Sequence, residues 1–175
     1  YVAAHWEARQ WLTGFTGSAG TAVVTMNKAA LWTDSRYFLQ AEEQLKGTGI
    51  FLMKEKLIST PTIGEWLKEE VKVGAKVGID GWLDNGSYSE DIRLHLQSTL
   101  CYCGDPFERI WEKRPTLPND PLFILEECFS GKSCQEKIAD IKAIYRQQNC
   151  TGILLSALDE IAWTLNLRCN DVHCN

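Results

Sequence analysis

The glycine-rich run Gly14–Gly20 is the stretch of the chain that most resembles a ligand-binding loop, because its backbone can turn tightly and approach a phosphate. It lacks the Gly-Lys-Ser/Thr ending of a P-loop, and it precedes a β-type run rather than a helix. Ser18 is a poor nucleophile candidate, since Thr16 stands where a nucleophile elbow needs its first glycine. We interpret the run as a structural turn. The three histidines stand in no recognisable triad order: His5, His95 and His173.

Two groups of residues could supply soft metal ligands, but neither has the paired C-x₂-C frame of a zinc site. They are Cys101 with Cys103, and Cys169 with His173 and Cys174. Buried or incidental thiols are the simpler interpretation. Asp159 and Glu160 could be paired acid–base carboxylates, yet adjacent helical positions diverge by about 100°. Two acids in sequence are typical of a helix N-terminus, where negative charge is favoured.

Arg36 is the residue whose position is hardest to explain by helix electrostatics. If Asp34 or Ser35 caps the helix that follows, Arg36 lies in its first turn, where a cation opposes the macrodipole by about 0.3–1 kcal/mol. A solvated arginine paired with Asp34 is one interpretation. The other is that the planar guanidinium is held out from a strand–helix junction to bind a carboxylate or a carbonyl. Physics alone leaves both open.

Composition bounds the class of protein. A chain of 175 residues that is 45% hydrophobic can form one domain, or one domain and part of another. The net charge of −5 disfavours nucleic acid as a partner, and no apolar run approaches the ~20 residues of a membrane span. The seven cysteines are odd in number and unevenly spread, which favours reduced thiols and a cytoplasmic location over a disulfide framework.

The elements that would position Arg36 are predicted from periodicity and turn residues. We expect a β-hairpin from residues 21–25 and 29–33, then a helix from Arg36 to about Lys46. Alternating strands and helices should follow: a strand at 50–53, a helix opened by Thr60-Pro61, a strand at 77–80, and a helix carrying Ile92, Leu96 and Leu100 that a Ser87-x-x-Glu90 capping box begins. This order predicts an α/β domain with a mixed sheet. Most of the seven tryptophans should be core, and one or two near the glycine turn could line a groove or a subunit contact.

The composition of the sequence changes at Pro106. Four prolines fall within sixteen residues there, and they predict a linker. Beyond it a second unit is expected. A Ser133-x-x-Glu136 capping box should begin one helix, residues 152–155 should form a strand, and a further helix should run from Glu160 to Leu167. One helix–strand–helix is too little to bury a core alone, so we expect a second domain that is cut at Asn175.

Four blocks of the sequence resemble the N-terminal half of X-prolyl aminopeptidase (aminopeptidase P), and most closely its long, three-domain cytosolic form. The blocks are Gly14–Ala22, Leu31-Trp-Thr-Asp-Ser-Arg-Tyr-Phe-Leu-Gln40, Ile110-Trp-Glu-Lys-Arg-Pro115, and Ala157-Leu-Asp-Glu-Ile-Ala-Trp163 with Asn166-Leu-Arg168. They occur in the order and spacing of that family and span nearly the whole chain. Cys169-Asn170 departs from the more usual Gly-Ser of the family.

The resemblance implies a creatinase N-terminal-like α/β domain at residues 1–115, with a mixed sheet flanked by helices. The truncated start of a similar domain is then expected at 116–175. It also implies an opening strand before Tyr1. A C-terminal pita-bread domain would bind two divalent metal ions, usually manganese, through two aspartates, a histidine and two glutamates. None of these ligands is expected in this chain, so we expect no catalytic or metal-binding residue here and no activity of the chain alone.

The activity that the resemblance implies is release of an N-terminal residue from a peptide with proline at the second position, by a protein that forms a homodimer. In the long form, the arginine of the Trp-Thr-Asp-x-Arg-Tyr block is associated with peptide binding, and it matches Arg36. Two alternatives stay open: a non-catalytic interaction or scaffold module with this fold, and the N-terminal part of a related pita-bread enzyme, prolidase or creatinase.

Overall fold

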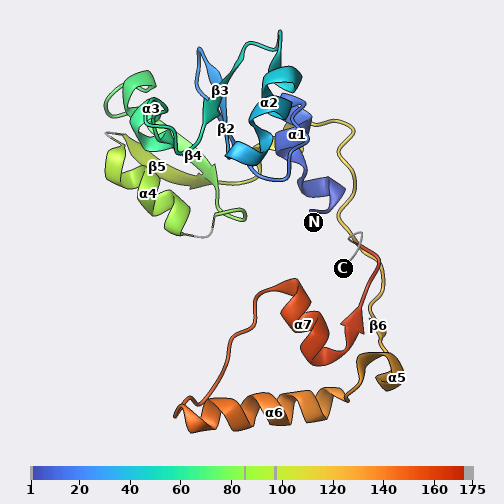
Figure 1. Cartoon of the computed structure of the whole chain (residues 1–175). Helices are drawn as coiled ribbons and strands as arrows, with labels where there is room; N and C mark the ends of the chain where they lie inside the picture. Colours follow the sequence, from blue (N-terminus) through green and yellow to red (C-terminus); the bar gives the residue numbers. More distant parts are fainter. Residues whose placement is uncertain (1, 85, 97, 172–175) are drawn as a thin grey trace. The chain divides into compact units, whose positions relative to one another are not determined.

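The computed structural model describes residues 2–84, 86–96 and 98–171, which divide into two compact units (Figure 1). One unit is Trp6–Pro115, and the other is Thr116–Asn175 together with Tyr1–His5.

The first helix of the unit Trp6–Pro115 is α1, Ala8–Thr13, and a short 3₁₀ turn, Ala4–Trp6, precedes it in the chain. A three-stranded sheet follows in the order β1 (Thr21–Val24), β2 (Ala29–Thr33) and β3 (Ile50–Lys54). β1 and β2 pair antiparallel, which confirms the predicted hairpin, whereas β2 and β3 pair parallel, with Ala29 opposite Ile50. The crossover between β2 and β3 contains α2, Phe38–Leu45.

β2 is buried on both of its faces, and its side chains alternate between two hydrophobic clusters. Ala30 and Trp32 pack toward α3 (Ile63–Glu70), where the Trp32 ring meets Trp66 edge to face at 5.4 Å. Leu31 lies in the other cluster with residues of α2 and the glycine-rich run. A strand buried on both sides has little freedom to slip, because a shift of one residue would exchange its two faces.

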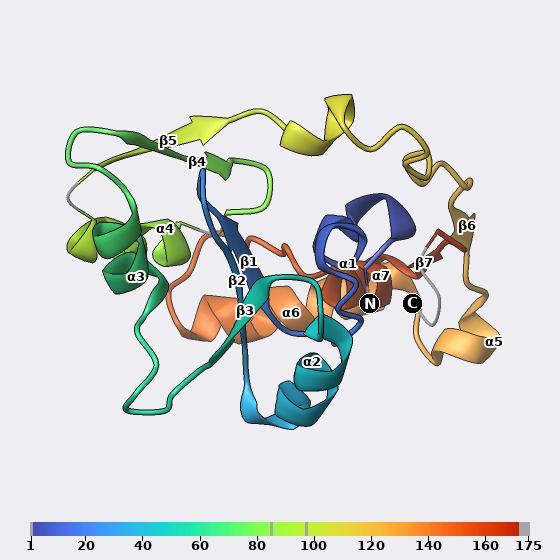
Figure 2. The same ribbon diagram turned by 90° about the horizontal axis from the view of Figure 1, so that it is seen from above.

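Two parallel strands, β4 (Lys76–Asp80) and β5 (Thr99–Cys103), form a second sheet (Figure 2). The helices α3 and α4 (Ser87–His95) pack against each other. Gly64 makes this approach possible, since a Cβ there would lie 2.7 Å from the His95 Cβ.

Three sequence predictions in this region are wrong. α3 begins after Thr62 rather than at Thr60-Pro61, because Thr62 and Glu65 form a capping box. The N-cap of α4 is Gly86, whose N–H donates to Asp84 Oδ1 at 3.1 Å, so the turn comes one residue earlier than the expected cap.

The third error concerns Leu100, which lies in β5 and not in the predicted helix. The helix ends at His95, and Leu96 already has an extended backbone. Pairing with β4 decides the conformation of the segment that follows, since Leu100 stands opposite Val77 in the parallel register.

The proline-rich stretch is partly ordered by aromatic contacts with the start of the unit. Pro106–Arg109 form a 3₁₀ turn. Trp111 stacks on Trp11 of α1 at 5.2 Å, and Phe107 meets the same ring edge to face at 6.0 Å. The predicted linker therefore holds residues that pack into the first unit.

The prediction that most tryptophans are core is wrong. Only Trp32 and Trp66 are buried, whereas the Trp82 side chain is 85% exposed. The remaining rings lie at partly or fully exposed positions: Trp6, Trp11, Trp111 and Trp163.

The described residues of the second unit form a two-stranded antiparallel sheet and three α-helices. Its elements are β6 (Phe123–Ile124), α5 (Glu127–Ser130), α6 (Cys134–Gln147), α7 (Leu158–Leu165) and β7 (Leu167–Arg168). Ser133 and Glu136 form the predicted capping box of α6. The predicted strand at 152–155 is wrong: the segment is unpaired within the described residues, and Leu154 is 91% exposed. α7 begins at Leu158, two residues before the predicted Glu160.

Lys137 is the buried cation of the second unit. Its ammonium donates to the Trp163 carbonyl at 3.0 Å and to Asn166 Oδ1 at 2.6 Å, and it lies 4.5 Å from the centre of the Trp163 ring. Because these acceptors lie at the C-terminal end of α7, where the helix dipole is negative, Lys137 holds α6 and α7 together.

The capping box of α3 generates the first prediction. Thr62→Ala removes the hydroxyl that accepts the Glu65 N–H, so the free energy of opening of α3 should fall by about 1 kcal/mol. Native-state hydrogen exchange of the α3 amides measures this loss. Thr60→Ala, two residues before the cap, is the matched control and should change the exchange little. Equal effects of the two variants would contradict the structural cap position.

Candidate functional site

The candidate site is the surface formed by the glycine-rich run Gly14–Gly20, called here the glycine loop, and the strand–helix junction 34–37. The loop connects α1 to β1, and the junction follows directly from β2. Arg36, the one site residue predicted from the sequence, lies at this junction.

Two glycines let the loop adopt its conformation. A Cβ on Gly17 would lie 2.2 Å from Cζ of Phe15, whose ring is fully buried. Gly20 has φ of +155°, and a Cβ there would lie 2.8 Å from the Trp32 carbonyl oxygen. Thr33 adds a further anchor, since its hydroxyl donates to the Ala19 carbonyl at 2.7 Å. The loop thus lies against the end of β2, as the structural-turn interpretation requires.

Side-chain hydrogen bonds join the loop to the junction and to α2. Ser18 Oγ and the Tyr37 hydroxyl are 2.6 Å apart. The Thr16 N–H donates to Gln44 Oε1 at 3.0 Å, and the Thr16 hydroxyl accepts from the amides of Gln40 and Gln44. The exposed polar rim of the loop is therefore held by α2.

Arg36 is held by Asp34 through both its backbone and its side chain, yet much of that side chain is exposed. Asp34 is the N-cap of a three-residue 3₁₀ turn, Ser35–Tyr37, and its Oδ1 accepts the Arg36 N–H at 3.0 Å. The guanidinium binds the same carboxylate through Nε at 2.9 Å and Nη2 at 2.7 Å, and it lies 5.2 Å from the centre of the Tyr37 ring. The Arg36 side chain is 67% exposed.

This geometry shows the first of the two interpretations of Arg36, the pair with Asp34, and leaves donors free for the second. The Asp34 carboxylate pairs with the Arg36 guanidinium. Its negative charge offsets the unfavourable interaction between that cation and the positive end of the helix dipole. The pair uses two of the five N–H donors of the guanidinium, so three point elsewhere. An arginine held from behind and exposed in front can bind a carboxylate or a carbonyl group without first being ordered.

The ion pair also shifts the titration of both groups. The hydrogen bond from the Arg36 side chain is the main cause that lowers the pKa of Asp34 to about 2, and the backbone N–H of Arg36 adds to it. The same hydrogen bond raises the pKa of Arg36 above its ordinary value. Both groups are therefore charged at neutral pH.

Sequence reasoning missed four of the residues that build this surface. Tyr37, Gln40, Gln44 and Arg9 were not singled out. The signal for Tyr37 was its place next to Arg36, since arginine commonly lies over an aromatic ring. The contacts of Gln40 and Gln44 cross 24 and 28 residues of sequence, which no local pattern reveals.

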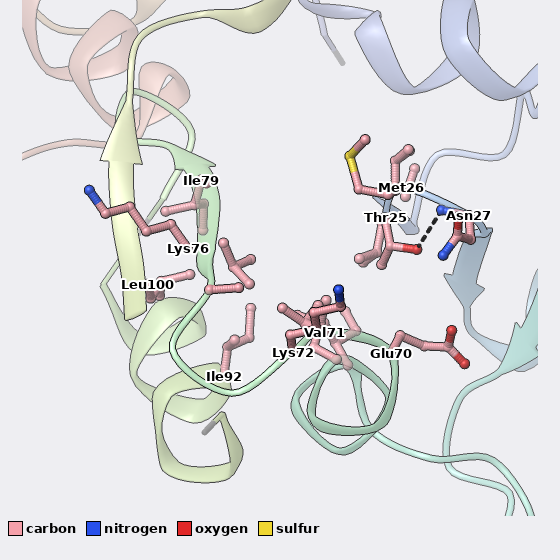
Figure 3. Close-up of a pocket in the computed structure, with 18 of the residues that line it drawn as sticks. Thr25, Met26, Asn27, Glu70, Val71, Lys72, Lys76, Ile79, Ile92 and Leu100 are labelled. Carbon is pink, nitrogen blue, oxygen red and sulfur yellow. Dashed lines mark hydrogen bonds between the residues drawn. The ribbon is translucent and has the colours of Figure 1, made fainter. Parts of the chain in front are cut away.

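A second feature of the first unit is an apolar groove of about 720 Å³ between β1 and β4 (Figure 3). All four residues of β1 line one side, and residues 76–79 of β4 line the other. α3 contributes Ile63 and Leu67, and Val71 lines the groove directly after the helix ends. Within the described residues, β1 pairs only with β2 and β4 only with β5, so each strand presents an unpaired edge to the groove.

The described residues do not form a metal centre. No three histidine, cysteine, aspartate or glutamate side chains among them come together as ligands. Six cysteines of the described ranges are free thiols. His173 and Cys174, set aside with Cys169 as a metal site on sequence grounds, lie outside those ranges, as does Asn175. Of the helices in the described part of the chain, none is both long and apolar enough to cross a membrane.

Comparison with known proteins gives matches along nearly the whole chain. Two family models, both described as Creatinase/Prolidase N-terminal domain, match residues 2–110 and 113–175. Xaa-Pro aminopeptidase 2 of Homo sapiens is 42% identical over 182 residues, and Xaa-Pro aminopeptidase 1 of Dictyostelium discoideum is 35% identical over 187. Each alignment covers 100% of this chain, but only 27% and 30% of the respective relative.

A solved structure agrees with these matches. X-prolyl aminopeptidase from Caenorhabditis elegans, described as a cytosolic enzyme with a di-nuclear active site, superposes with a TM-score of 0.84 at 30% identity. The match covers 98% of this chain and 29% of that chain. The resemblance inferred from the four sequence blocks and the predicted creatinase-type α/β fold are confirmed.

The Asp34–Arg36 pair generates a prediction on pH. Because the pKa of Asp34 is lowered from 3.8 to about 2, the pair should be fully formed above pH 4 and should be lost only as the pH falls toward 2. The ¹³Cγ shift of Asp34 in an NMR titration follows this loss directly. Arg36→Met is the control that keeps an apolar stem and should return the pKa of Asp34 toward 3.8. A midpoint at or above 3.8 in the unsubstituted chain would contradict the pair.

Proposed function

This chain belongs to the creatinase/prolidase N-terminal domain family, and from that membership we propose that it is the N-terminal region of an Xaa-Pro aminopeptidase. The sequence matches to proteins of that name and the structural match to the Caenorhabditis elegans enzyme support the proposal. The whole protein would release the first residue of peptides that carry proline at the second position. The chain spans about 27% of its human relative, and the proposal assigns the reaction itself to polypeptide outside it.

Within that protein, Arg36 would bind the peptide substrate. The observation that carries this role is the exposed guanidinium whose back is fixed by Asp34 and Tyr37 while three donors stay available. A peptide offers matching acceptors in its carbonyl groups and its C-terminal carboxylate. The first unit would therefore form a wall of the substrate channel and would contribute binding rather than bond cleavage.

The metal chemistry would be supplied by another part of the protein. The Caenorhabditis elegans neighbour is described as having a di-nuclear active site, and the described residues of this chain do not provide ligands for two metal ions. We place the metals, with manganese as the proposed ion, in a C-terminal domain. A homodimer and a cytoplasmic location complete the proposal, the latter supported by the description of the neighbour as cytosolic.

The groove between β1 and β4 would receive the opening strand that the resemblance places before Tyr1. Directly after β1, the Thr25 N–H donates to the Lys28 carbonyl at 2.8 Å, so the backbone of Thr25 points toward the side of β2. Backbone groups alternate along an antiparallel pair, which turns those of Ala22 and Val24 toward the groove.

The same reasoning applies to β4. The Thr99 N–H donates to the Ala75 carbonyl at 3.0 Å, so Ala75 faces β5, and Lys76 and Gly78 turn their backbone groups toward the groove. A strand with apolar side chains would satisfy both edges and cover the apolar lining. The two sheets would then become one continuous mixed sheet.

The proposed role of Arg36 is tested in the full-length protein that contains this chain. Arg36→Ala removes the guanidinium that would bind the peptide, so kcat/KM for an Xaa-Pro peptide should fall about tenfold to a hundredfold, chiefly through KM. Steady-state kinetics over a range of peptide concentrations separate the two constants.

Two controls accompany that measurement. Arg36→Lys keeps the charge but not the fork, so it should restore activity only in part. The 175-residue chain alone is the background and should cleave no Xaa-Pro peptide, with or without manganese. Unchanged kinetics of Arg36→Ala would refute the peptide contact, and cleavage by the chain alone would refute a metal centre located elsewhere.

The proposed opening strand is tested by hydrogen exchange. In the 175-residue chain the amides of Ala22, Val24 and Gly78 should exchange quickly, because they face the groove. In a version extended by the residues that precede Tyr1 in the parent protein, the same amides should be protected at least tenfold. The amide of Val23, which faces β2, is the internal control and should change much less. No gain in protection would show that another segment, or none, fills the groove.

A further inference from the structure

Arg9 of α1 lies behind the glycine loop and binds it at two points. Its Nη1 donates to the Gly20 carbonyl at 2.8 Å, and its Nη2 donates to the Gly17 carbonyl. The guanidinium also lies 5.6 Å from the centre of the Phe15 ring. One side chain thus holds two carbonyls of the loop, on either side of Ser18.

The environment of Arg9 shows that this contact is built into the fold and is not a surface encounter. The Nε atom is buried and has no hydrogen-bond partner within the described part of the chain. Burial lowers the pKa of Arg9, because desolvation penalises the charged form, while Tyr37 and Glu7 oppose the shift. Partial burial of a cation with an unsatisfied donor destabilises the folded state. The two hydrogen bonds to the loop offset that destabilisation.

A short series of contacts connects the glycine loop to Arg36. Between the two carbonyls that Arg9 binds, Ser18 reaches the Tyr37 hydroxyl at 2.6 Å. The Tyr37 ring also meets Phe15 edge to face at 6.0 Å, and it supports the Arg36 guanidinium at 5.2 Å. Each contact in the series is direct.

We propose that Arg9 is a positioning residue for Arg36: it fixes the glycine loop so that Ser18 orients the Tyr37 ring, and that ring holds the guanidinium of Arg36 at the peptide site. The proposal rests on the role of Arg36 given above. Arg9 itself lies behind the loop and touches no substrate in this scheme. Its effect is on where the Arg36 donors point.

The first experiment is independent of activity. In ¹⁵N,¹³C-labelled 175-residue chain, Arg9→Met should shift the Tyr37 ring signals and broaden the Arg36 Nε–H signal, because the loop loses both anchors. Tyr37→Phe removes only the bond to Ser18 and should broaden the Arg36 signal alike without touching Arg9. If Arg9→Met leaves the Tyr37 and Arg36 signals unchanged while the chain stays folded, the proposal is wrong.

The second experiment is a double-substitution cycle in the full-length protein. Arg9→Met should raise KM for an Xaa-Pro peptide about tenfold with kcat nearly unchanged, and Arg9→Lys should recover part of that loss. When Arg36 is already Ala, Arg9→Met should add almost nothing, because the two residues act in one series. Additive effects would refute the link between Arg9 and Arg36.

The two experiments separate the possible failures. If Arg36→Ala alone has no effect on KM, the peptide-binding role fails, yet the NMR spectra still decide whether Arg9 orders Arg36. If Arg9→Met does not fold, Arg9→Lys and Tyr37→Phe provide the same comparison with smaller perturbations. A fall in kcat for Tyr37→Phe with KM unchanged would contradict a positioning role.

Discussion

The burial of β2 on both faces is the constraint on which the first unit depends. Trp32 and Leu31 point to opposite sides of the strand, and each belongs to a separate hydrophobic cluster. Burying side chains of this size stabilises the fold by about 1.5–3 kcal/mol each. Because both faces are committed, the strand cannot shift along its axis, and its last residue, Thr33, is fixed relative to the glycine loop. Residues 34–36 follow directly after β2, so the position of the Arg36 side chain depends on the core.

The sequence predicted this region well where local and long-range preferences agree. The hairpin of β1 and β2 combines apolar β-type residues with a polar turn, and the capping box of Ser133 has its glutamate at the required spacing. Prediction failed where two local signals compete, as for Thr60-Pro61 and Thr62, or where pairing with a distant strand decides the conformation, as for Leu100. The apolar run 152–155 has the composition of a strand, but within the described residues it has no partner.

The candidate site was predictable only in part for the same reason. Arg36 could be recognised because a cation at a helix start is locally unfavourable, and an unfavourable local choice indicates a constraint from elsewhere. Its anchors could not be recognised. Arg9 and Ser18 are ordinary residues in sequence, and they acquire meaning only when the loop folds back on the end of β2. The contacts of Arg9 and Ser18 are therefore visible only in the folded structure.

The aromatic contacts at the two ends of the first unit have a mechanical consequence. Trp11 lies near the point where the chain enters the unit, and Trp111 lies just before it leaves, and their rings are stacked. Arg114 adds to this closure, with its guanidinium over both Trp111 and Trp6. A pulling force applied to the chain after Pro115 therefore acts on these aromatic contacts before it acts on either sheet of the first unit.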